Sequence, residues 1–486
     1  MKPQFPKPTT QQPVSATSAP RQQNVQRPVT TTTNPAVQAN NTKEVFLKKL
    51  MVCSQVLDFN DESRNVNEKK ERLKILQELS ETITSPQQMT NLIIPSLEAV
   101  INMIKRNIFR PLPIVKKQGV AGETGLEDDE VIVDPSWPHL QPVYEFFLQL
   151  IINESVDMKS LRSFISHKFI QEFLELFDSE EPKEREYLKN ILHRLYAKLV
   201  PRRKMIRKAI TDNFNTLIHE TYKFNGTSEL LDILASVISG FAVPLREEHV
   251  IFFHNIIIPL HKVQTCHKFH NELLRCSMLF LSKEPTLAFP LINGLLKYWP
   301  FANYTKETLF LAELLDILEV SCDPQKLEPL LPKIFKRIIK CISYPHLQVS
   351  DRSMCFFENE FFLNILKTYK QIAFPILVPV ITHLASHHWH KLILESLTAL
   401  RNIIKDADPV LFEKYANDPD SPYLYLIKDP KTLAGERAVA EKKWQALADK
   451  AIDANPSFQL PVVPYIDDHI VGKFNGVNNG SVLYVD

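Results

Sequence analysis

The chain has 486 residues, 44% of them hydrophobic, so it can bury a large core and is long enough for several domains or one repeat array. Lysine and arginine number 57 and aspartate and glutamate 56, so no net field favours nucleic acid or an anionic membrane. The N-terminus has no apolar signal region, and the longest apolar run, around 373–381, contains two prolines. We therefore expect a soluble protein that acts on neither nucleic acid nor membrane.

The cysteines point to a reducing compartment. No two of them form a C-x-x-C pair, and most stand in apolar helical stretches, as buried free thiols do. This pattern predicts a cytoplasmic protein, with the nucleus as a second location. The six cysteines are at positions 53, 266, 276, 322, 341 and 355.

The two ends of the chain differ in composition from its middle. Residues 1–43 are rich in Pro, Gln, Thr and Asn and contain no acidic residue, so they bury too little apolar surface to offset chain entropy. Residues 456–486 are rich in Asn, Gly and Pro. We predict a disordered tail at 1–43, a folded region at 44–455 and a mobile tail at 456–486.

The folded region is predicted to be all-α. Ten glycines in the whole chain leave little room for tight β-hairpins, and apolar residues recur with helical spacing. The clearest amphipathic helices are expected at 47–58, 71–84, 89–106, 205–221, 228–240, 307–319 and 329–342. A period of about 45 residues fits roughly nine helical units into this length, and prolines recur at expected helix starts. We therefore predict a HEAT-like helical-repeat solenoid.

One long interruption, 110–135, separates the expected helices. It contains Pro and Gly together with an acidic run of four residues. A loop of this length is uncommon between packed helices. An acidic run is usually a solvated loop, and a contact with a partner is the other interpretation. The run consists of Glu127, Asp128, Asp129 and Glu130.

Signals for catalysis and for metal binding are weak. The chain has no Gly-rich phosphate loop, no G-x-S-x-G and no H-E-x-x-H. Ligand-type residues cluster at 261–270 and at 387–390, but neither cluster has four ligands at a usual zinc spacing, so solvated or core-edge histidines explain both. We expect a protein that is not an enzyme and that needs no metal and no cofactor.

Two stretches carry charged and aromatic side chains that core packing does not explain. In "LHRLYAKL" (192–199) the apolar positions follow helical spacing, which leaves His193 and Tyr196 together on a neighbouring face. In "VPLREEH" (243–249) Arg246 and His249 stand three apart at an expected helix start, where backbone N–H groups favour an anion. Together they are typical of a site for an acidic, partly apolar peptide.

The region between these stretches supplies further candidates. The basic run at 202–208 could bind nucleic acid, but on a neutral protein it is more often a solvated face or a docking site. In the helix expected at 228–240, Ile233 and Val237 lie on one side with Asp232 beside them, opposite a core-facing stripe. Core packing alone would also explain Ile233 and Val237.

From 136 to 353 the chain carries an ordered series of sequence blocks. They are "SWPHLQPVYEFF" (136–147), "LELFDSEEPKEREYLKNILHRLYAKL" (174–199), "IRKAI" (206–210), "GFAVPLREEH" (240–249), "IPLHK" (258–262), "LLKYWP" (295–300) and "PHLQVSDRS" (345–353). In this order the blocks resemble those of the B56 (B-prime) regulatory subunits of protein phosphatase 2A. The resemblance covers roughly 44–455, and its length and order make it far more specific than any short motif.

The resemblance implies a non-catalytic subunit that docks on the phosphatase scaffold (A) and catalytic (C) subunits and recruits phosphoprotein substrates through an L-x-x-I-x-E motif. It also implies that the run 127–130 faces the catalytic subunit. A generic helical-repeat scaffold or transport adaptor that binds acidic peptides is the alternative. The positions that match the family's motif groove are His193, Arg194, Tyr196, Arg203, Asp232, Ile233, Val237, Arg246 and His249.

Some of these positions depart from the family pattern. Val237 replaces a usual isoleucine, Asp232 a usual glutamate and Arg246 a usual lysine, which keeps the chemistry but can change pocket depth and motif preference. The tail segment Val463–Asp468 is a degenerate version of the expected motif. Chance resemblance is one interpretation of this segment, and occupation of the groove is the other.

Overall fold

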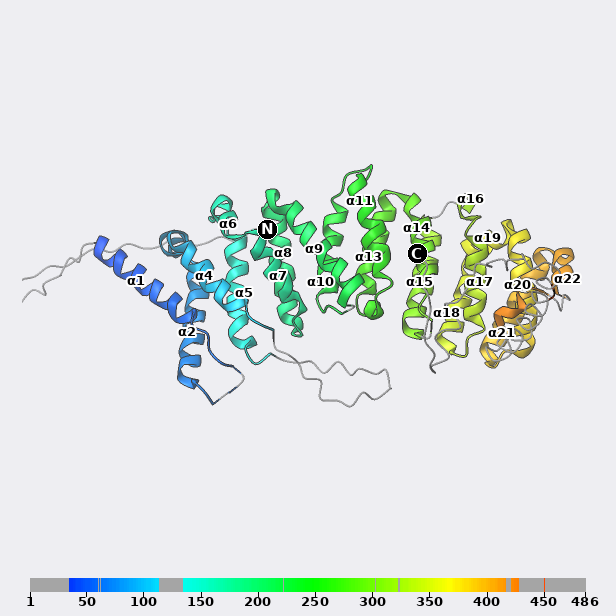
Figure 1. The fold of residues 1–486 in the computed structure, drawn as a ribbon, viewed down its shortest axis with the longest axis horizontal. Coiled ribbons are helices and arrows are strands. Elements are labelled where there is room, and N and C mark those ends of the chain that lie inside the picture. The colour runs from blue at the N-terminus through cyan, green and yellow to red at the C-terminus, as the bar shows by residue number, and fades with distance from the viewer. Residues whose placement is uncertain are drawn as a thin grey trace, which may run out of the picture. The chain divides into compact units, whose positions relative to one another are not determined.

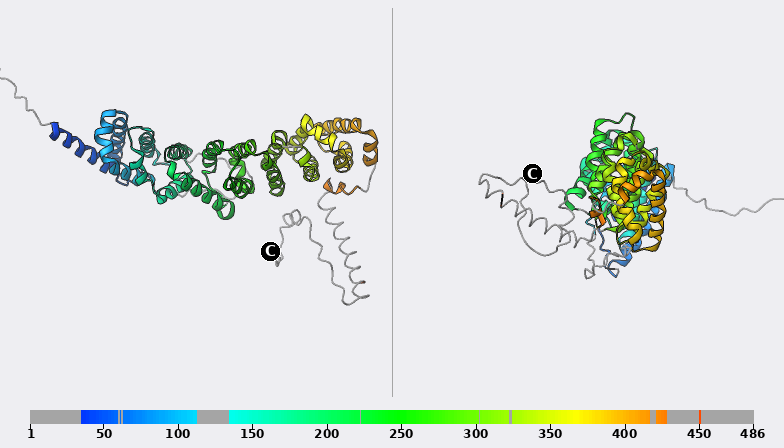
Figure 2. Two further views of the ribbon diagram at one scale, coloured as in Figure 1. Left: turned by 90° about the horizontal axis from the view of Figure 1, so that it is seen from above. Right: turned by 90° about the vertical axis from the view of Figure 1, so that its right-hand side faces the viewer.

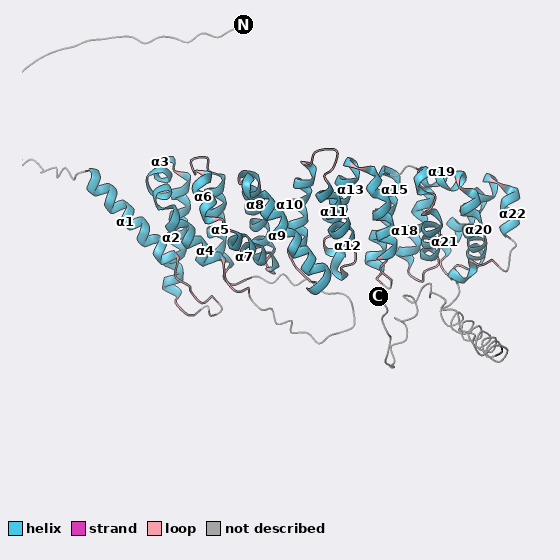
Figure 3. Ribbon diagram, turned by 45° about the horizontal axis from the view of Figure 1, so that its top comes forward, coloured by secondary structure: helices cyan, strands magenta, loops and turns pink. Residues whose placement is uncertain are grey.

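The structure is a computed structural model that describes residues 35–59, 61, 63–112, 134–221, 223–301, 303–321, 324–416, 421–427 and 450. Every regular element in these ranges is a helix (Figure 3), which confirms the all-α prediction. The described chain divides into two compact units, one made of residues up to 111 together with 134–164 and one that starts at Ile165. The acidic run 127–130 and the tail 456–486 lie outside the described residues.

In the first unit, α1 and α4 form one packed pair and α2 and α5 another, with α1 on α2 and α4 on α5. Arg72, only 4% exposed, donates to the side chain of Asn107, whose amide donates in turn to the carbonyl oxygen of Cys53 at 3.0 Å, so one polar network joins α1, α2 and α4. The helices are α1 (Pro35–Cys53), α2 (Val66–Thr84), α3 (Pro86–Gln88), α4 (Leu97–Ile108), α5 (Trp137–Ile152) and α6 (Met158–Phe164).

The start of α1 differs from the expectation. The helix begins at Pro35, nine residues before the folded region expected from Glu44. A proline fits the first turn of a helix, because its missing N–H would have no partner there. The long interruption after α4 is closed at its ends, where Arg110 and Asp134 form an ion pair at 2.7 Å.

The second unit contains the remaining described helices (Figure 1). They are α7 (His167–Glu175), α8 (Pro182–Lys198), α9 (Arg203–Thr216), α10 (Thr227–Ser239), α11 (Glu247–Phe252), α12 (Ile258–Leu260), α13 (His270–Lys283), α14 (Ala288–Lys297), α15 (Tyr304–Ser321), α16 (Pro324–Leu327), α17 (Leu331–Ile342), α18 (Leu347–Glu358), α19 (Glu360–Thr368), α20 (Lys370–His387), α21 (Lys391–Ala407) and α22 (Pro409–Ala416). A π-helical turn, Phe253–Ile257, joins α11 to α12.

These helices form two rows. In one row α8, α10, α13, α15, α18 and α21 pack in sequence, and in the other α12, α14, α17 and α20 do so. The left view of Figure 2 shows this part of the chain nearly end-on to its helices, in two layers. Successive helices of the first row start 45, 43, 34, 43 and 44 residues apart. This two-layer period is that of a HEAT-like solenoid, as the sequence predicted.

Apolar stripes hold the rows together where the sequence placed them. In α8 the stripe at 188, 191, 192 and 195 is fully buried, and in α9 Ile206, Ile210 and Phe214 are at most 1% exposed. Helix starts also match the proline pattern: Pro182 opens α8, Pro332 stands second in α17 and Pro409 opens α22. Helical periodicity therefore predicted both α8 and α9 and their core faces.

The histidine cluster at 261–270 is part of the core. His261 and His270 both point their Nε2 atoms at the carboxylate of Glu313 in α15, at 3.1 and 2.8 Å, and all three side chains are at most 3% exposed. Burial alone would raise the pKa of Glu313, but the two rings hold it at about 2. The cluster therefore links α12 and α13 to α15, while His267 is exposed to solvent.

The cysteines in the described part of the chain carry free thiols. Cys53, Cys266, Cys276 and Cys341 are free and buried, and Cys355 is half-buried. Burial raises the pKa of Cys53 to about 11 and that of Cys266 and Cys276 to about 12. A thiol that stays protonated is a poor nucleophile, so packing accounts for these residues.

Candidate functional site

The C-terminal half of α8 carries a polar stripe along the side that faces α10. Lys189, His193 and Tyr196 follow i, i+4, i+7 spacing, which aligns them on one helix face. At one end of the stripe, the Nζ of Lys189 lies 3.2 Å from a carboxylate oxygen of Asp232 in α10. His193 and its neighbour Arg194 are exposed, and Tyr196 is half-buried. A ligand lying along α8 can reach all of these groups.

Two arginines of α9 surround Tyr196 at the other end of the stripe. Arg203 donates from Nε and Nη2 to the carbonyl oxygens of Tyr196 and Ala197, each at 3.0 Å, and its guanidinium lies 5.3 Å from the centre of the Tyr196 ring. Arg207, one turn later, donates from Nη1 to the Tyr196 hydroxyl at 3.0 Å. A guanidinium has five N–H donors, so both arginines keep donors for a carboxylate or phosphate.

His249 of α11 lies close to this arginine pair. Its ring stacks on Phe241 with centroids 3.6 Å apart, and its buried Nδ1 has no hydrogen-bond partner. Burial is the largest influence on the pKa of His249 and lowers it; Glu248 opposes this shift, while the charges of Arg207 and Arg246 add to it. The ring is therefore neutral near pH 7, and an incoming carboxylate would favour its protonation.

Arg246 is the N-cap residue of α11, which confirms the helix start expected after Pro244. The first turn already contains Glu247 and Glu248, whose charges complement the positive end of the helix. Backbone attraction for an external anion is therefore weaker here than the sequence suggested. The Arg246 side chain is 77% exposed and 3.8 Å from Glu248, so it can turn toward a ligand.

Helix α10 contributes a paired carboxylate and two buried aliphatic side chains. Asp232 lies between Lys189 of α8 and Arg275 of α13, at 3.2 and 2.7 Å. Ile233 is 2% exposed and Val237 8%, so both belong to the core of the repeat. Core packing, one of the explanations that the sequence left open, therefore accounts for both residues, and Val237 is the one nearer to solvent.

The start of α10 is fixed by close contact with the turn before α8. A Cβ on Gly226 would lie 2.4 Å from the Cβ of Phe177 and 2.6 Å from its carbonyl oxygen, so only glycine fits there. Asn225 adds two hydrogen bonds to Asp178, at 3.0 and 2.9 Å. These contacts set the position of Asp232 relative to α8.

The structure joins some of the candidate residues directly and others through neighbouring side chains. Tyr196 contacts Arg203 directly, Arg246 and His249 both lie near Glu248, and Asp232 reaches the α8 stripe through Lys189. Among the missed partners, Arg207 had a signal, because it stands one helical turn after Arg203 within the basic run. Phe241, Lys189 and Arg275 had none, since their roles depend on how neighbouring repeats pack.

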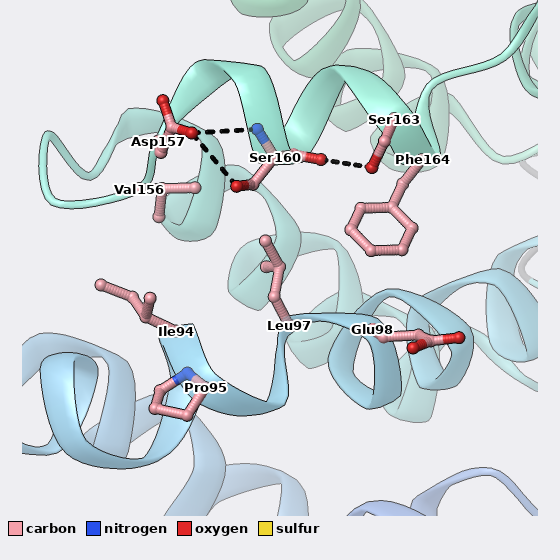
Figure 4. Close-up of a pocket in the computed structure, with 9 residues that line it drawn as sticks. All are labelled: Ile94, Pro95, Leu97, Glu98, Val156, Asp157, Ser160, Ser163 and Phe164. Atoms are coloured by element: carbon pink, nitrogen blue, oxygen red, sulfur yellow. Dashed lines mark hydrogen bonds between the residues drawn. The ribbon is translucent and has the colours of Figure 1, made fainter.

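A second feature, in the first unit, is a pocket of about 320 Å³ between α6 and the turn before α4 (Figure 4). The carboxylate of Asp157 accepts hydrogen bonds from the backbone N–H and the hydroxyl of Ser160, and Ser163 donates to the Ser160 carbonyl at 2.7 Å. The polar groups of Asp157, Ser160 and Ser163 therefore serve the first turn of α6. The lining residues are Ile94, Pro95, Leu97, Glu98, Val156, Asp157, Ser160, Ser163 and Phe164.

Within the described ranges, no group of three or more His, Cys, Asp or Glu side chains is placed to hold a metal ion. In the same ranges, no helix is both long enough and apolar enough to cross a membrane. The α8–α11 surface offers cations, a neutral imidazole and aromatic rings around the half-buried Tyr196.

Comparison with known families decides the identity of this helical array. The family model described as "Protein phosphatase 2A regulatory B subunit (B56 family)" matches residues 31–451. The chain belongs to the B56 family. The B' eta isoform of the 59 kDa regulatory subunit from Arabidopsis thaliana is 36% identical over 412 residues, which cover 84% of this chain and 79% of that protein. The alpha isoform of the human 56 kDa regulatory subunit is 36% identical over 411 residues, covering 85% and 82%.

Membership of the B56 family confirms the resemblance seen in the ordered blocks. It makes the chain a regulatory subunit of protein phosphatase 2A rather than a catalytic one. The family therefore replaces the transport adaptor as the interpretation of this helical array.

Proposed function

We propose that this B56 subunit docks on the scaffold and catalytic subunits of protein phosphatase 2A and recruits phosphoproteins that carry an L-x-x-I-x-E motif, so directing their dephosphorylation in signal transduction. The binding surface would be the one formed by α8, α9, α10 and α11. The observation that carries the proposal is the cationic cluster in which Arg203 and Arg207 surround Tyr196 beside His249.

The acidic end of the motif fits this cluster. The terminal glutamate would accept charge-assisted hydrogen bonds from Arg207 and from His249, whose ring gains a proton when a carboxylate approaches. The exposed Arg246 would add a third cation. Such bonds contribute about 1.5–3 kcal/mol each when a charged group takes part, so the acidic residue would be a main determinant of affinity.

The apolar positions of the motif fit the aromatic part of the surface. The half-buried rings of Tyr196 and Phe241 offer contact area, and Val237 lies directly below the surface at 8% exposure. Ile233 is buried more deeply, so it would shape the pocket through the residues packed on it. At the motif's second position, the exposed His193 and Arg194 would favour an acidic or phosphorylated residue.

A pull-down tests the docking part of the proposal. The full chain should recover the phosphatase scaffold and catalytic subunits, and failure to recover them would falsify it. Peptide binding tests the recruitment part. Replacing Arg194, Arg207 or His249 with alanine should weaken binding of a fluorescent L-x-x-I-x-E peptide by about 2 kcal/mol, roughly 30-fold, while the holoenzyme still assembles.

A matched control separates specific contacts from general charge. Lys208→Ala removes one exposed cation from α9 next to Arg207. It should change peptide affinity by less than about threefold, as expected for an exposed charge near but outside the contact. Equal losses for Lys208→Ala and Arg207→Ala would mean that only net charge matters, and loss of holoenzyme assembly in Arg207→Ala would mean that the surface serves assembly instead.

A further inference from the structure

The C-terminal segment 456–486 contains a sequence that resembles the motif proposed to bind the α8–α11 surface. Val463 and Ile466 are aliphatic residues three apart, and Asp468 follows two residues later, the spacing of L-x-x-I-x-E. No other six-residue window in 456–486 has aliphatic residues at its first and fourth positions and an acidic residue at its sixth. The segment lies outside the described residues.

Charge complementarity supports this pairing. Asp467 and Asp468 are two of the three acidic residues in 456–486, which contain a single lysine, so the negative charge of the segment is concentrated at the acidic end of the match. The surface presents Arg203, Arg207 and the 77% exposed Arg246. The adjacent carboxylates would therefore meet a cluster of guanidinium groups, as in arginine recognition of acidic motifs.

The chain is long enough for the segment to reach the surface of its own molecule. In the second unit, the helical turn 424–427 packs on α17 and α20. From α17, a series of packed helices leads to α10 through α18, α15 and α13. Four steps of 8–10 Å amount to about 40 Å. The 35 residues between Ile427 and Val463 span about 50 Å as a helix and about 120 Å when extended, so either conformation permits contact.

We propose that Val463–Asp468 binds the α8–α11 surface of its own chain and competes with motif-bearing partners. This inference rests on the function proposed above and names a regulator of the same site. Valine in place of leucine and aspartate in place of glutamate make the segment a weak ligand, but tethering supplies an effective concentration on the order of 1 mM. A segment with a dissociation constant of about 0.1–1 mM would then weaken partner binding about two- to tenfold.

The test compares three versions of the full chain with one fluorescent L-x-x-I-x-E peptide. The variant Val463→Ala/Ile466→Ala should bind the peptide about two- to tenfold more tightly than the unchanged chain. The control Val471→Ala/Val477→Ala makes the same kind of change in the same segment and should bind like the unchanged chain. Equal affinity for all three would overturn the proposal, and so would an equal gain in the control.

Two further results separate this inference from the function on which it rests. If the peptide binds none of the chains, the proposed function fails; if it binds all three equally, only the self-binding fails. Sedimentation distinguishes binding within one chain from binding between copies. The unchanged chain should remain monomeric over the concentration range of the assay, and a self-association that Val463→Ala/Ile466→Ala abolishes would overturn the intramolecular form of the proposal.

Discussion

Replacing Gly226 with alanine tests how the site-bearing helix is positioned. The new Cβ would lie 2.4 Å from the Cβ of Phe177 and 2.6 Å from its backbone oxygen, whereas carbon atoms in good contact are about 3.5–4.0 Å apart. Phe177 is fully buried and fixed in the turn before α8, so α10 has to move by about 1 Å. Such overpacking costs about 1–3 kcal/mol.

Gly240, at the other end of α10, provides the matched control. A Cβ there would lie 3.5 Å from the carbonyl oxygen of Val237, which is an ordinary contact, and both glycines have negative φ values that alanine adopts readily. Gly240→Ala should therefore be neutral or stabilising by up to about 1 kcal/mol, because it reduces the entropy of the unfolded chain. The two substitutions are chemically identical and differ only in the space around them.

Urea denaturation followed by circular dichroism would measure the difference, with peptide affinity as the second measurement. We expect Gly226→Ala to unfold at lower urea than Gly240→Ala by the equivalent of about 2 kcal/mol. It should also weaken peptide binding, since displacement of α10 moves Asp232 and Val237. Equal urea midpoints for the two variants would refute the reasoning, because they would mean that the turn at Phe177 shifts without loss of stability.

Two further predictions concern titratable groups. Glu313→Ala leaves His261 and His270 without their shared carboxylate in the core and should lower the free energy of unfolding by about 3–5 kcal/mol, measured by urea denaturation. Because the folded-state pKa of Glu313 is about 2 against an ordinary 4.5, its stabilising contribution should be present above pH 4.5 and fade as the pH falls toward 2 in acid titrations. Peptide affinity should rise as the pH falls from 7.5 to 5.5, because the lowered pKa of His249 leaves a neutral ring that takes up a proton when the carboxylate binds. His249→Gln should reduce this dependence, and an unchanged profile would exclude His249 as the titrating contact.

The helical pattern of α8 shows why much of the fold was predictable. Its apolar positions recur with a period that only one buried face can explain, and the same spacing left His193 and Tyr196 outside the core. The pattern also gave the helix start at α11, because Pro244 and the charged residues after it form a recognisable boundary. These features depend on residues close together in the sequence, which is where periodicity and capping rules apply.

The parts that sequence reasoning missed depend on packing between repeats. The sequence left open whether Ile233 and Val237 of α10 belong to the core. Helices α8 and α13 flank α10, and periodicity within one helix cannot count its neighbours. The stacking of Phe241 on His249 depends on the path of the loop between α10 and α11. The early start of α1 was hidden because its first residues have the polar composition of a disordered tail.

The hydrogen bonds and ion pairs between neighbouring repeats have a mechanical consequence. Arg185 to Glu229, Asp232 to Arg275 and Trp389 to Tyr344 join residues 44, 43 and 45 positions apart, one repeat length each. An array linked only to its neighbours bends by small rotations at every step. Asp232 ties α8, α10 and α13 with one carboxylate, so the three repeats around the binding surface should flex as a single stiff segment. Bending would then occur mainly in the repeats on either side of this segment. The binding surface would keep its shape without a bound peptide.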